Sequence, residues 1–231
     1  MIETIALAFA GLLVLFFIYS LLKSGLFDQH KVSVVEDVPH LAKPLIVYYK
    51  YHVGAYSGVG HLFDEVKQLV PSGAKTFGMY YDDPRETKDE LCQSAIGVIY
   101  GEDGTDTYGD NYATQLRAVV VRQSFNNWMS LYVMVYKTYK TICQFIMDNR
   151  LETGLSIEVY SKDENGEYVD IIFPLDRMKE FFVEEHLTTE ALESKLASRH
   201  FDSDLSDSES EPEPDETENE QEGDAQENSA E

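Results

Sequence analysis

An uninterrupted apolar segment near the N-terminus constrains what this chain can fold into more than any other feature. Residues 5–22 contain no charged residue and no proline. A helix of that length rises about 27 Å, close to the bilayer hydrocarbon thickness of about 30 Å. A secretory signal peptide would have a basic start and a small-residue cleavage site, whereas residues 1–4 contain Glu3 and no basic residue. We therefore predict an uncleaved transmembrane anchor at residues 5–22.

The charges that flank this segment predict its orientation. Glu3 lies on the short side, while Lys23, His30 and Lys31 lie on the long side. Positively charged flanks remain in the cytosol. Residues 1–4 are therefore expected in the lumen of a membrane-bounded organelle, and everything after the anchor is expected in the cytosol.

The negative charge of the chain is concentrated at its end. The formal net charge is -24, and residues 201–231 hold 14 Asp and Glu residues and no Lys or Arg. Because this segment has too little apolar surface to offset the entropy of ordering, it is predicted to be a disordered acidic tail. Phosphate contacts need Lys and Arg, so direct binding of nucleic acid is not expected.

The two cysteines, Cys92 and Cys143, lie far apart in the sequence and lack the spacing of metal ligands. Free thiols are typical of a reducing cytosol, in agreement with the predicted orientation. The sequence therefore predicts no metal site and no cofactor.

Between anchor and tail, one order of elements occurs twice. Residues 23–43 form a juxtamembrane linker, in which 32–35 is a weak candidate for an edge strand. Composition and periodicity then predict the following elements: strands at 45–53, 75–81 and 94–100 with a helix at 61–70, and strands at 116–122, 156–160 and 168–173 with a helix from Asn126 or Asn127 to 149. The Asn-Gly pair within 163–166 predicts a hairpin turn. The domain is expected to cover 44–185, with a short helix within 186–200.

Two strand–helix–strand–strand units usually share one antiparallel sheet, with both helices on one face and a cleft on the other. Side chains alternate between the two faces of a strand, so Ile157 is expected toward the helices, and Glu158 and Tyr160 toward the cleft. The same alternation directs Tyr48 and His52 toward the cleft, where they could line a ligand site.

The long helix from Asn126 or Asn127 to 149 carries apolar residues at helical spacing. Those expected to face the core are Leu131, Val135, Tyr139, Ile142 and Ile146. Its remaining aromatic residues, Trp128, Tyr132 and Tyr136, are also expected to be core and packing residues and not cofactor contacts.

Three segments resemble the gyrase-inhibitor-like (GyrI-like) small-molecule-binding domain. They are HVGAY at 52–56, LSIEVY at 155–160 and DIIFPL at 170–175. The resemblance implies an α+β fold of duplicated β-α-β-β units and a cleft in which Glu158 meets cationic or polar ligands. The alternative is that Glu158 is a solvated carboxylate on the outer face of its strand.

An enzyme is the less favoured interpretation. Some GyrI-like proteins hydrolyse small electrophiles, and this implies Glu158 as general base and Tyr160 as proton donor. The sequence shows no nucleophile–His–Asp set, so a hydrolase stays an alternative only.

Within the same family, the anchor and the stretches VYYKYHVGAY, YYDDP and SAIGVI most resemble an endoplasmic-reticulum membrane protein that acts as an autophagy receptor. The resemblance implies an endoplasmic-reticulum location and a tail that docks Atg8-family ubiquitin-like proteins. It also implies an adaptor role for a AAA-type unfolding ATPase. A membrane-tethered small-molecule sensor is the alternative.

The tail departs from the docking motif that such receptors carry. That motif is aromatic-x-x-aliphatic and binds as an added strand, whereas Phe201 is followed three residues later by Asp204 and four later by Leu205. The extra residue displaces one anchor by about 3.3 Å in an extended strand. Ser206 and Ser208 each precede an acidic residue by three positions, so they are candidate phosphorylation sites that would add negative charge beside Phe201 and Leu205.

Overall fold

The computed structural model describes residues 1–71, 73–102 and 116–207, with side chains as far as Ser198. The chain divides into two compact units, Met1–Leu187 and Thr188–Glu231. In the second unit, helix α5 covers Thr189–Asp207 and the Thr188 hydroxyl accepts a hydrogen bond from the Ala191 amide. The helix therefore includes residues 201–207, which the sequence predicts to be disordered. Residues 208–231 of the predicted tail lie outside the described part.

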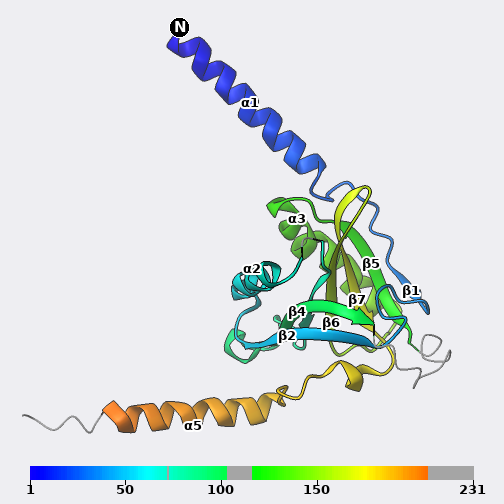
Figure 1. Ribbon diagram of the computed structural model, residues 1–231, viewed down its shortest axis with the longest axis vertical. Coiled ribbons are helices and arrows are strands. Elements are labelled where there is room, and N and C mark those ends of the chain that lie inside the picture. The colour runs from blue at the N-terminus through cyan, green and yellow to red at the C-terminus, as the bar shows by residue number, and fades with distance from the viewer. Residues whose placement is uncertain (72, 103–115, 208–231) are drawn as a thin grey trace, which may run out of the picture. The chain divides into compact units, whose positions relative to one another are not determined.

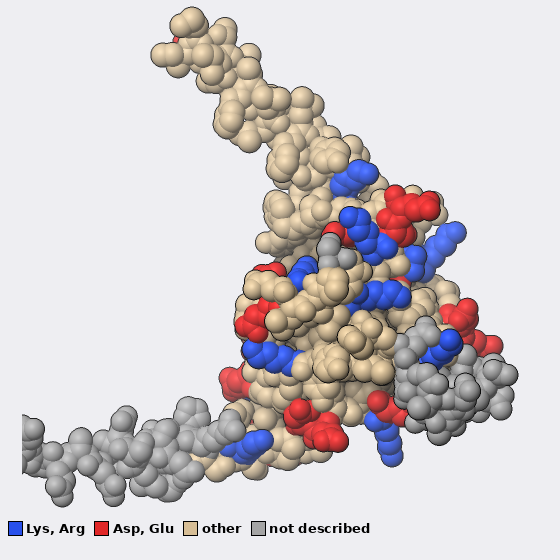
Figure 2. Space-filling model, in the orientation of Figure 1, with Lys and Arg blue, Asp and Glu red and all other residues tan. Residues whose placement is uncertain are grey.

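Helix α1, Ile2–Leu22, is the one helix in the described part of the chain that is long and apolar enough to cross a membrane. All of its residues are exposed except Ser20 and Leu21. Figures 1 and 2 show the helix leading away from the domain with an uncharged surface along its middle. An exposed apolar surface of this extent is typical of a site that contacts a membrane or another protein.

The domain is built on one antiparallel sheet, and its fold is α+β, as predicted. The strands are β1 (Ser33–Val35), β2 (Leu45–Val53), β3 (Thr76–Tyr80), β4 (Gln93–Glu102), β5 (Ala118–Ser124), β6 (Ser156–Asp163) and β7 (Gly166–Pro174). Their order in the sheet is β1-β5-β7-β6-β3-β4-β2. From the central β6–β3 pair outward, one half of the sheet runs β3, β4, β2 and the other half runs β6, β7, β5. Both halves therefore place the second, third and first strands of a three-strand group in the same order.

Two groups of helices lie on one face of the sheet. The first is α2 (Gly60–Leu69), and the second is the continuous run α3 (Trp128–Val133), η5 (Met134–Thr138) and α4 (Tyr139–Asp148). Short 3-10 turns occupy η1 (Tyr56–Gly58), η2 (Asp89–Leu91) and η6 (Met178–Phe181). Asn127 caps α3 with a reciprocal capping box, as its position predicts.

The segment η5 is a π-helical turn, and it changes which residues of the long helix are buried. The wider turn inserts one extra residue into the helix, so Ser130 and Met134, not Leu131 and Val135, share the buried side with Ile142. The prediction that Leu131 and Val135 face the core is therefore wrong. Trp128, Tyr132 and Tyr136 are all exposed, so the part of their prediction that placed them in the core is also wrong.

The other face of the sheet carries the larger core. It contains Phe77, Ile157 and Val159, and it is covered by Val38 and Leu41 from the predicted linker and by Phe181 and Val183 after β7. The prediction of an open cleft on the face opposite the helices is wrong, because two segments that look like connections in the sequence bury their few apolar side chains there. Strand β1 also pairs with β5, so the predicted linker is part of the domain.

Candidate functional site

Glu158 lies at the centre of the sheet, under the helices, and is almost fully buried at 3% exposure. The Tyr139 hydroxyl donates to its Oε1 at 2.5 Å and the Tyr160 hydroxyl donates to its Oε2 at 2.6 Å. Tyr80 supplies a third hydrogen bond. The carboxylate is thus enclosed by hydroxyl groups from β3, α4 and its own strand.

A glycine makes room for one of these tyrosines. Gly78 pairs with Glu158 between β3 and β6, and a Cβ atom at this position would lie 2.9 Å from the Tyr80 hydroxyl oxygen. The absence of a side chain therefore lets the Tyr80 ring fold back over its own strand toward the carboxylate.

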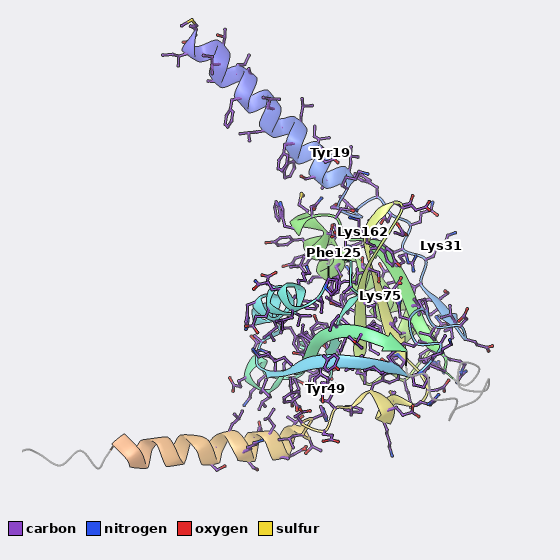
Figure 3. The ribbon with its side chains drawn as sticks, in the orientation of Figure 1. Tyr19, Lys31, Tyr49, Lys75, Phe125 and Lys162 are labelled. Atoms are coloured by element: carbon purple, nitrogen blue, oxygen red, sulfur yellow. The ribbon has the colours of Figure 1, made fainter. Side chains whose placement is uncertain are left out.

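A second layer of aromatic rings closes the site. The Tyr160 ring makes edge contacts with Phe63 of α2 and with Phe125, at centroid distances of 5.2 and 5.0 Å; Phe125 is labelled beside α3 in Figure 3. Tyr56 packs against Tyr80 at 4.9 Å. Edge-to-face pairs of this kind are favourable beyond their buried area, so the chain's own side chains fill the space over Glu158.

Glu158 and Tyr160 were predicted to face away from the helices. This prediction is wrong, because Glu158 contacts α4 and Tyr160 contacts α2. Ile157 and Val159 face the opposite core. The alternation of the strand was predicted correctly, but the segments that cover each face were not. The predicted sides of β2 are reversed as well. Val47 and Tyr51 pack on the sheet face opposite the helices, whereas Lys50 reaches Glu65 of α2 at 2.8 Å.

Burial changes the acid–base behaviour of this cluster. Desolvation raises the pKa of Glu158 above its usual value, although the hydrogen bonds from Tyr139, Tyr160 and Tyr80 act in the opposite direction. Burial and the neighbouring carboxyl group raise the pKa of each tyrosine well above its usual value, so the hydroxyls stay protonated and can donate. A carboxylate whose oxygens already accept hydrogen bonds is poorly placed to take a proton from water or substrate.

The other two predicted lining residues lie away from this cluster. Tyr48 is 62% exposed and makes an edge contact with Tyr100 at 5.5 Å. His52 has its pKa lowered by burial and by nearby His61, while a backbone hydrogen bond opposes the shift. In the described part of the chain, the hydrogen bonds to Glu158 come from the three tyrosines and not from Tyr48 or His52.

Two members of the cluster, Tyr80 and Tyr139, were not identified as site residues from the sequence. The helical spacing did place Tyr139 on an inner face, but its partner on β6 depends on long-range packing. For Tyr80, the sequence signal is Gly78 two positions earlier in a strand, since a strand glycine often marks close approach of another group.

A second buried carboxylate, Asp170, lies on the opposite face. Arg122 forms a fork with it at 2.7 and 2.8 Å, and His40 Nε2 lies 2.9 Å from its Oδ2. Burial acts to raise the pKa of Asp170, but the hydrogen bonds from His40 and Arg122 outweigh burial and hold it below its usual value. The Arg122 guanidinium also stacks over Tyr168 at 4.0 Å. With its charge fully paired, Asp170 is a structural group.

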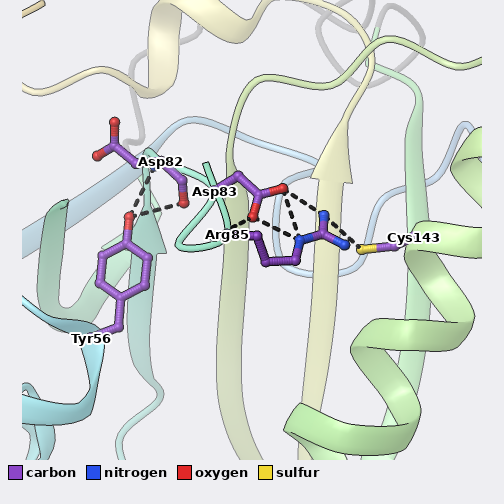
Figure 4. A network of polar contacts seen from close by, with 5 residues as sticks. All are labelled: Tyr56, Asp82, Asp83, Arg85 and Cys143. Carbon is purple, nitrogen blue, oxygen red and sulfur yellow. Dashed lines mark hydrogen bonds and ion pairs between the residues drawn. The ribbon is translucent and has the colours of Figure 1, made fainter. Parts of the chain in front are cut away.

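A further polar network surrounds the connection between β3 and β4 (Figure 4). The Tyr56 hydroxyl accepts a hydrogen bond from the Asp82 amide at 2.9 Å, and Asp83 forms an ion pair with Arg85 at 2.5 Å. Arg85 also lies 3.9 Å from the sulfur of Cys143 on α4. Both cysteines are free, and no group of three potential metal-ligating side chains occurs among the described residues. Through Arg85, this network brings the β3–β4 connection into contact with α4.

The described residues define an α+β domain on a single antiparallel sheet, preceded by a helix of membrane-spanning length. No protein-family model matches the chain. It is 25% identical over 159 residues to the testis-expressed protein 264 homolog of mouse, covering 63% of this chain and 50% of that protein. It is also 25% identical over 197 residues to human testis-expressed protein 264, covering 80% of this chain and 57% of the human protein.

These similarities confirm the resemblance drawn above from the anchor and from segments such as VYYKYHVGAY. The chain spans about half the length of the curated relatives it matches.

Proposed function

We propose that this protein is a receptor or adaptor anchored in the endoplasmic-reticulum membrane, with residues 1–4 in the lumen and the domain and tail in the cytosol. The observation that carries the proposal is an exposed helix of 21 residues, most of them apolar, that is attached to the edge of a well-packed domain. The similarity to testis-expressed protein 264 supports the same assignment. By this resemblance, the protein acts in selective autophagy of the endoplasmic reticulum.

The domain is proposed to be GyrI-like, with two duplicated β-α-β-β units. Strand order supports this proposal, because β5, β6 and β7 on one side of the sheet mirror the positions of β2, β3 and β4 on the other. Each set also has its helix between its first and second strands. A local pseudo-twofold axis between β3 and β6 would relate the two units.

A scaffold role for the domain is favoured over a hydrolase. Glu158 is the group that a GyrI-like hydrolase would use as general base, and here its two oxygens accept hydrogen bonds from Tyr139 and Tyr160. Both tyrosines hold their protons under ordinary conditions, because their pKa values are raised. Catalysis would require these contacts to break before water could reach the carboxylate.

The tail is proposed to dock Atg8-family proteins through Phe201 and Leu205, and the domain is proposed to serve a AAA-type unfolding ATPase as adaptor. The test of docking is capture of the detergent-solubilised full chain by an immobilised Atg8-family protein. The double variant Phe201→Ala with Leu205→Ala should abolish capture, whereas Ser203→Ala, between the two positions, should leave it unchanged. Capture that survives the double variant would contradict docking through this tail.

A membrane-tethered sensor of cationic small molecules is the second candidate. The observation behind it is the carboxyl group of Glu158 among the rings of Tyr139 and Tyr160, since carboxylates and aromatic rings are the groups that bind organic cations; this candidate requires the rings to move apart. The test is titration of the full chain with a cationic amphiphile. Glu158→Gln should lower the affinity without unfolding the protein, and the absence of binding by the unaltered chain would remove this candidate.

A further inference from the structure

The outward side of α3 and η5 is an apolar face that stays largely exposed in the described chain. Its residues are Trp128, Leu131, Tyr132, Val135 and Tyr136, each between 48% and 74% exposed. The rings of Trp128, Tyr132 and Tyr136 follow one another along the helix, at centroid distances of 5.7 and 6.5 Å. We call this set the aromatic face.

The aromatic face begins where the apolar helix α1 ends. The Asn127 side chain donates to the Ser20 carbonyl at 2.9 Å, and Lys137 donates to the Leu26 carbonyl at 2.5 Å. Asp28 accepts a hydrogen bond from the Ser124 amide at 3.0 Å. The end of α1 and the chain that follows it are thus attached to both ends of the aromatic face.

These attachments determine how deep the aromatic face lies if α1 crosses a membrane. A groove of about 400 Å³ is lined by Phe16, Tyr19 and Trp128; Tyr19 is labelled at the domain end of α1 in Figure 3. Phe16 precedes Leu22 by six residues, about 9 Å along the helix axis. Trp128 therefore lies beside a turn of α1 that belongs to the apolar segment, and not above its end.

The chemistry of the face matches that depth. A second groove of about 370 Å³ joins Leu21 and Leu26 to Tyr132 and Tyr136, and residues 123–136 contain no charged side chain. Lys23 and Lys137 border the face. Trp and Tyr with apolar neighbours and flanking Lys are typical of protein surfaces at the boundary between headgroups and acyl chains.

We propose that the aromatic face is a second membrane contact, which rests on the lipid surface beside α1 and holds the domain against the bilayer. This inference rests on the proposed membrane anchor. Because α1 and the face are joined by hydrogen bonds, insertion of α1 brings the face to the membrane without further ordering. The occupant is therefore lipid; a second copy of the chain or another protein would have to displace it.

Trp128 is the only tryptophan of the chain, so its fluorescence tests the proposal directly. The full chain is reconstituted into phosphatidylcholine vesicles, with or without lipids brominated on the acyl chain near the headgroup. We expect brominated lipid to reduce Trp128 emission by about twofold or more, while aqueous iodide has little effect. The double variant Trp128→Phe with Tyr136→Trp places the tryptophan about two turns further along the helix. Its emission should also be reduced by brominated lipid and little affected by iodide.

A charged variant and a matched control separate the face from α1. Leu131→Asp with Val135→Asp should restore iodide quenching and weaken bromine quenching at Trp128. Leu69→Asp with Met147→Asp, which changes two exposed apolar residues elsewhere, should do neither. Circular dichroism of all variants confirms that the domain remains folded.

The outcomes distinguish this inference from the anchor itself. A chain that resists carbonate extraction, but whose Trp128 responds to iodide and not to brominated lipid, keeps the anchor and overturns the inference. Shielding from both quenchers, with cross-linked dimers or another protein attached, also overturns it. A chain released by carbonate overturns both proposals.

Discussion

Tyr139 on α4 and Glu158 on β6 are joined by a 2.5 Å hydrogen bond, which ties the helix layer to the centre of the sheet. The two residues are 19 positions apart in the sequence and belong to elements that meet only in the folded domain. A site that looks like a ligand-binding glutamate in the sequence is therefore also a structural connection between layers.

Glu158→Ala is expected to lower the free energy of unfolding by about 2–4 kcal/mol, since it leaves a cavity and strands the tyrosine hydroxyls. Glu158→Gln keeps the shape and one acceptor, so it should cost less than about 1.5 kcal/mol. Urea denaturation of both variants measures the difference. Equal, small losses would show that the carboxylate does not connect the layers.

The stability of the domain should depend on pH through Glu158 in a definite direction. Because burial raises its pKa in the folded state, the folded protein binds this proton more tightly than the unfolded chain does. The contribution of Glu158 is therefore greatest at low pH and declines as pH rises above about 4.3, the value for an unfolded chain, and through the raised folded pKa. The stability of the unaltered protein relative to Glu158→Gln should fall across this range; an increase would contradict the assignment.

Asp170 should show the opposite dependence. Its pKa is lowered in the folded state by His40 and Arg122 despite burial, so its stabilising effect is present above about pH 3.9 and is lost as pH falls through the folded pKa. Asp170→Asn should cost about 1–3 kcal/mol at pH 7, because it removes a charged acceptor from Arg122 and His40, while the half-exposed Arg122 side chain keeps its contact with water. The difference between variant and parent, measured by urea denaturation, should shrink below pH 4. A constant difference would contradict the paired charge.

Gly78→Ala should destabilise the domain by about 1–3 kcal/mol, because the added methyl group displaces the Tyr80 ring from Glu158. Gly101→Ala is the matched control: it also changes a strand glycine, but its Cβ would meet no atom within 4 Å. Thermal unfolding of the two variants measures the effect. Equal melting temperatures would mean that the Tyr80 ring adjusts without cost.

Phosphorylation of Ser206 and Ser208 is expected to strengthen docking of an Atg8-family protein by about five- to tenfold. Ser206 lies in the last turn of α5, where added negative charge opposes the helix dipole. Docking as an added strand requires this turn to unwind, so the phosphate favours the bound form. Binding titrations of the full chain before and after kinase treatment test this, and the gain should fade at high salt. Weaker binding after phosphorylation would contradict it.

The sequence predicted most elements because their signals are local. The strand at 45–53, the Asn-Gly hairpin turn and the Asn127 cap each depend on a few neighbouring residues, and all are present. Strand alternation was also correct, so Glu158 and Tyr160 share one side as expected.

What the sequence did not reveal depends on distant contacts. The π-helical turn at Met134–Thr138 shifts the buried side of the long helix, and nothing in helical periodicity marks it. The sheet face beneath Val38, Leu41, Phe181 and Val183 is covered by segments whose composition is typical of loops. The covering segments are the reason that the predicted sides of the sheet were reversed. The π-helical turn is the reason that Tyr132 and Tyr136 face outward.

The membrane anchor and its orientation are tested most directly by protease protection of the full chain in sealed endoplasmic-reticulum microsomes. Added protease should digest the domain and tail without detergent, while the protein resists carbonate extraction before digestion. A lumenal protein should remain intact in the same sample, as the control for sealed membranes. Protection of the domain, or release of the chain by carbonate, would contradict a cytosolic domain held by α1.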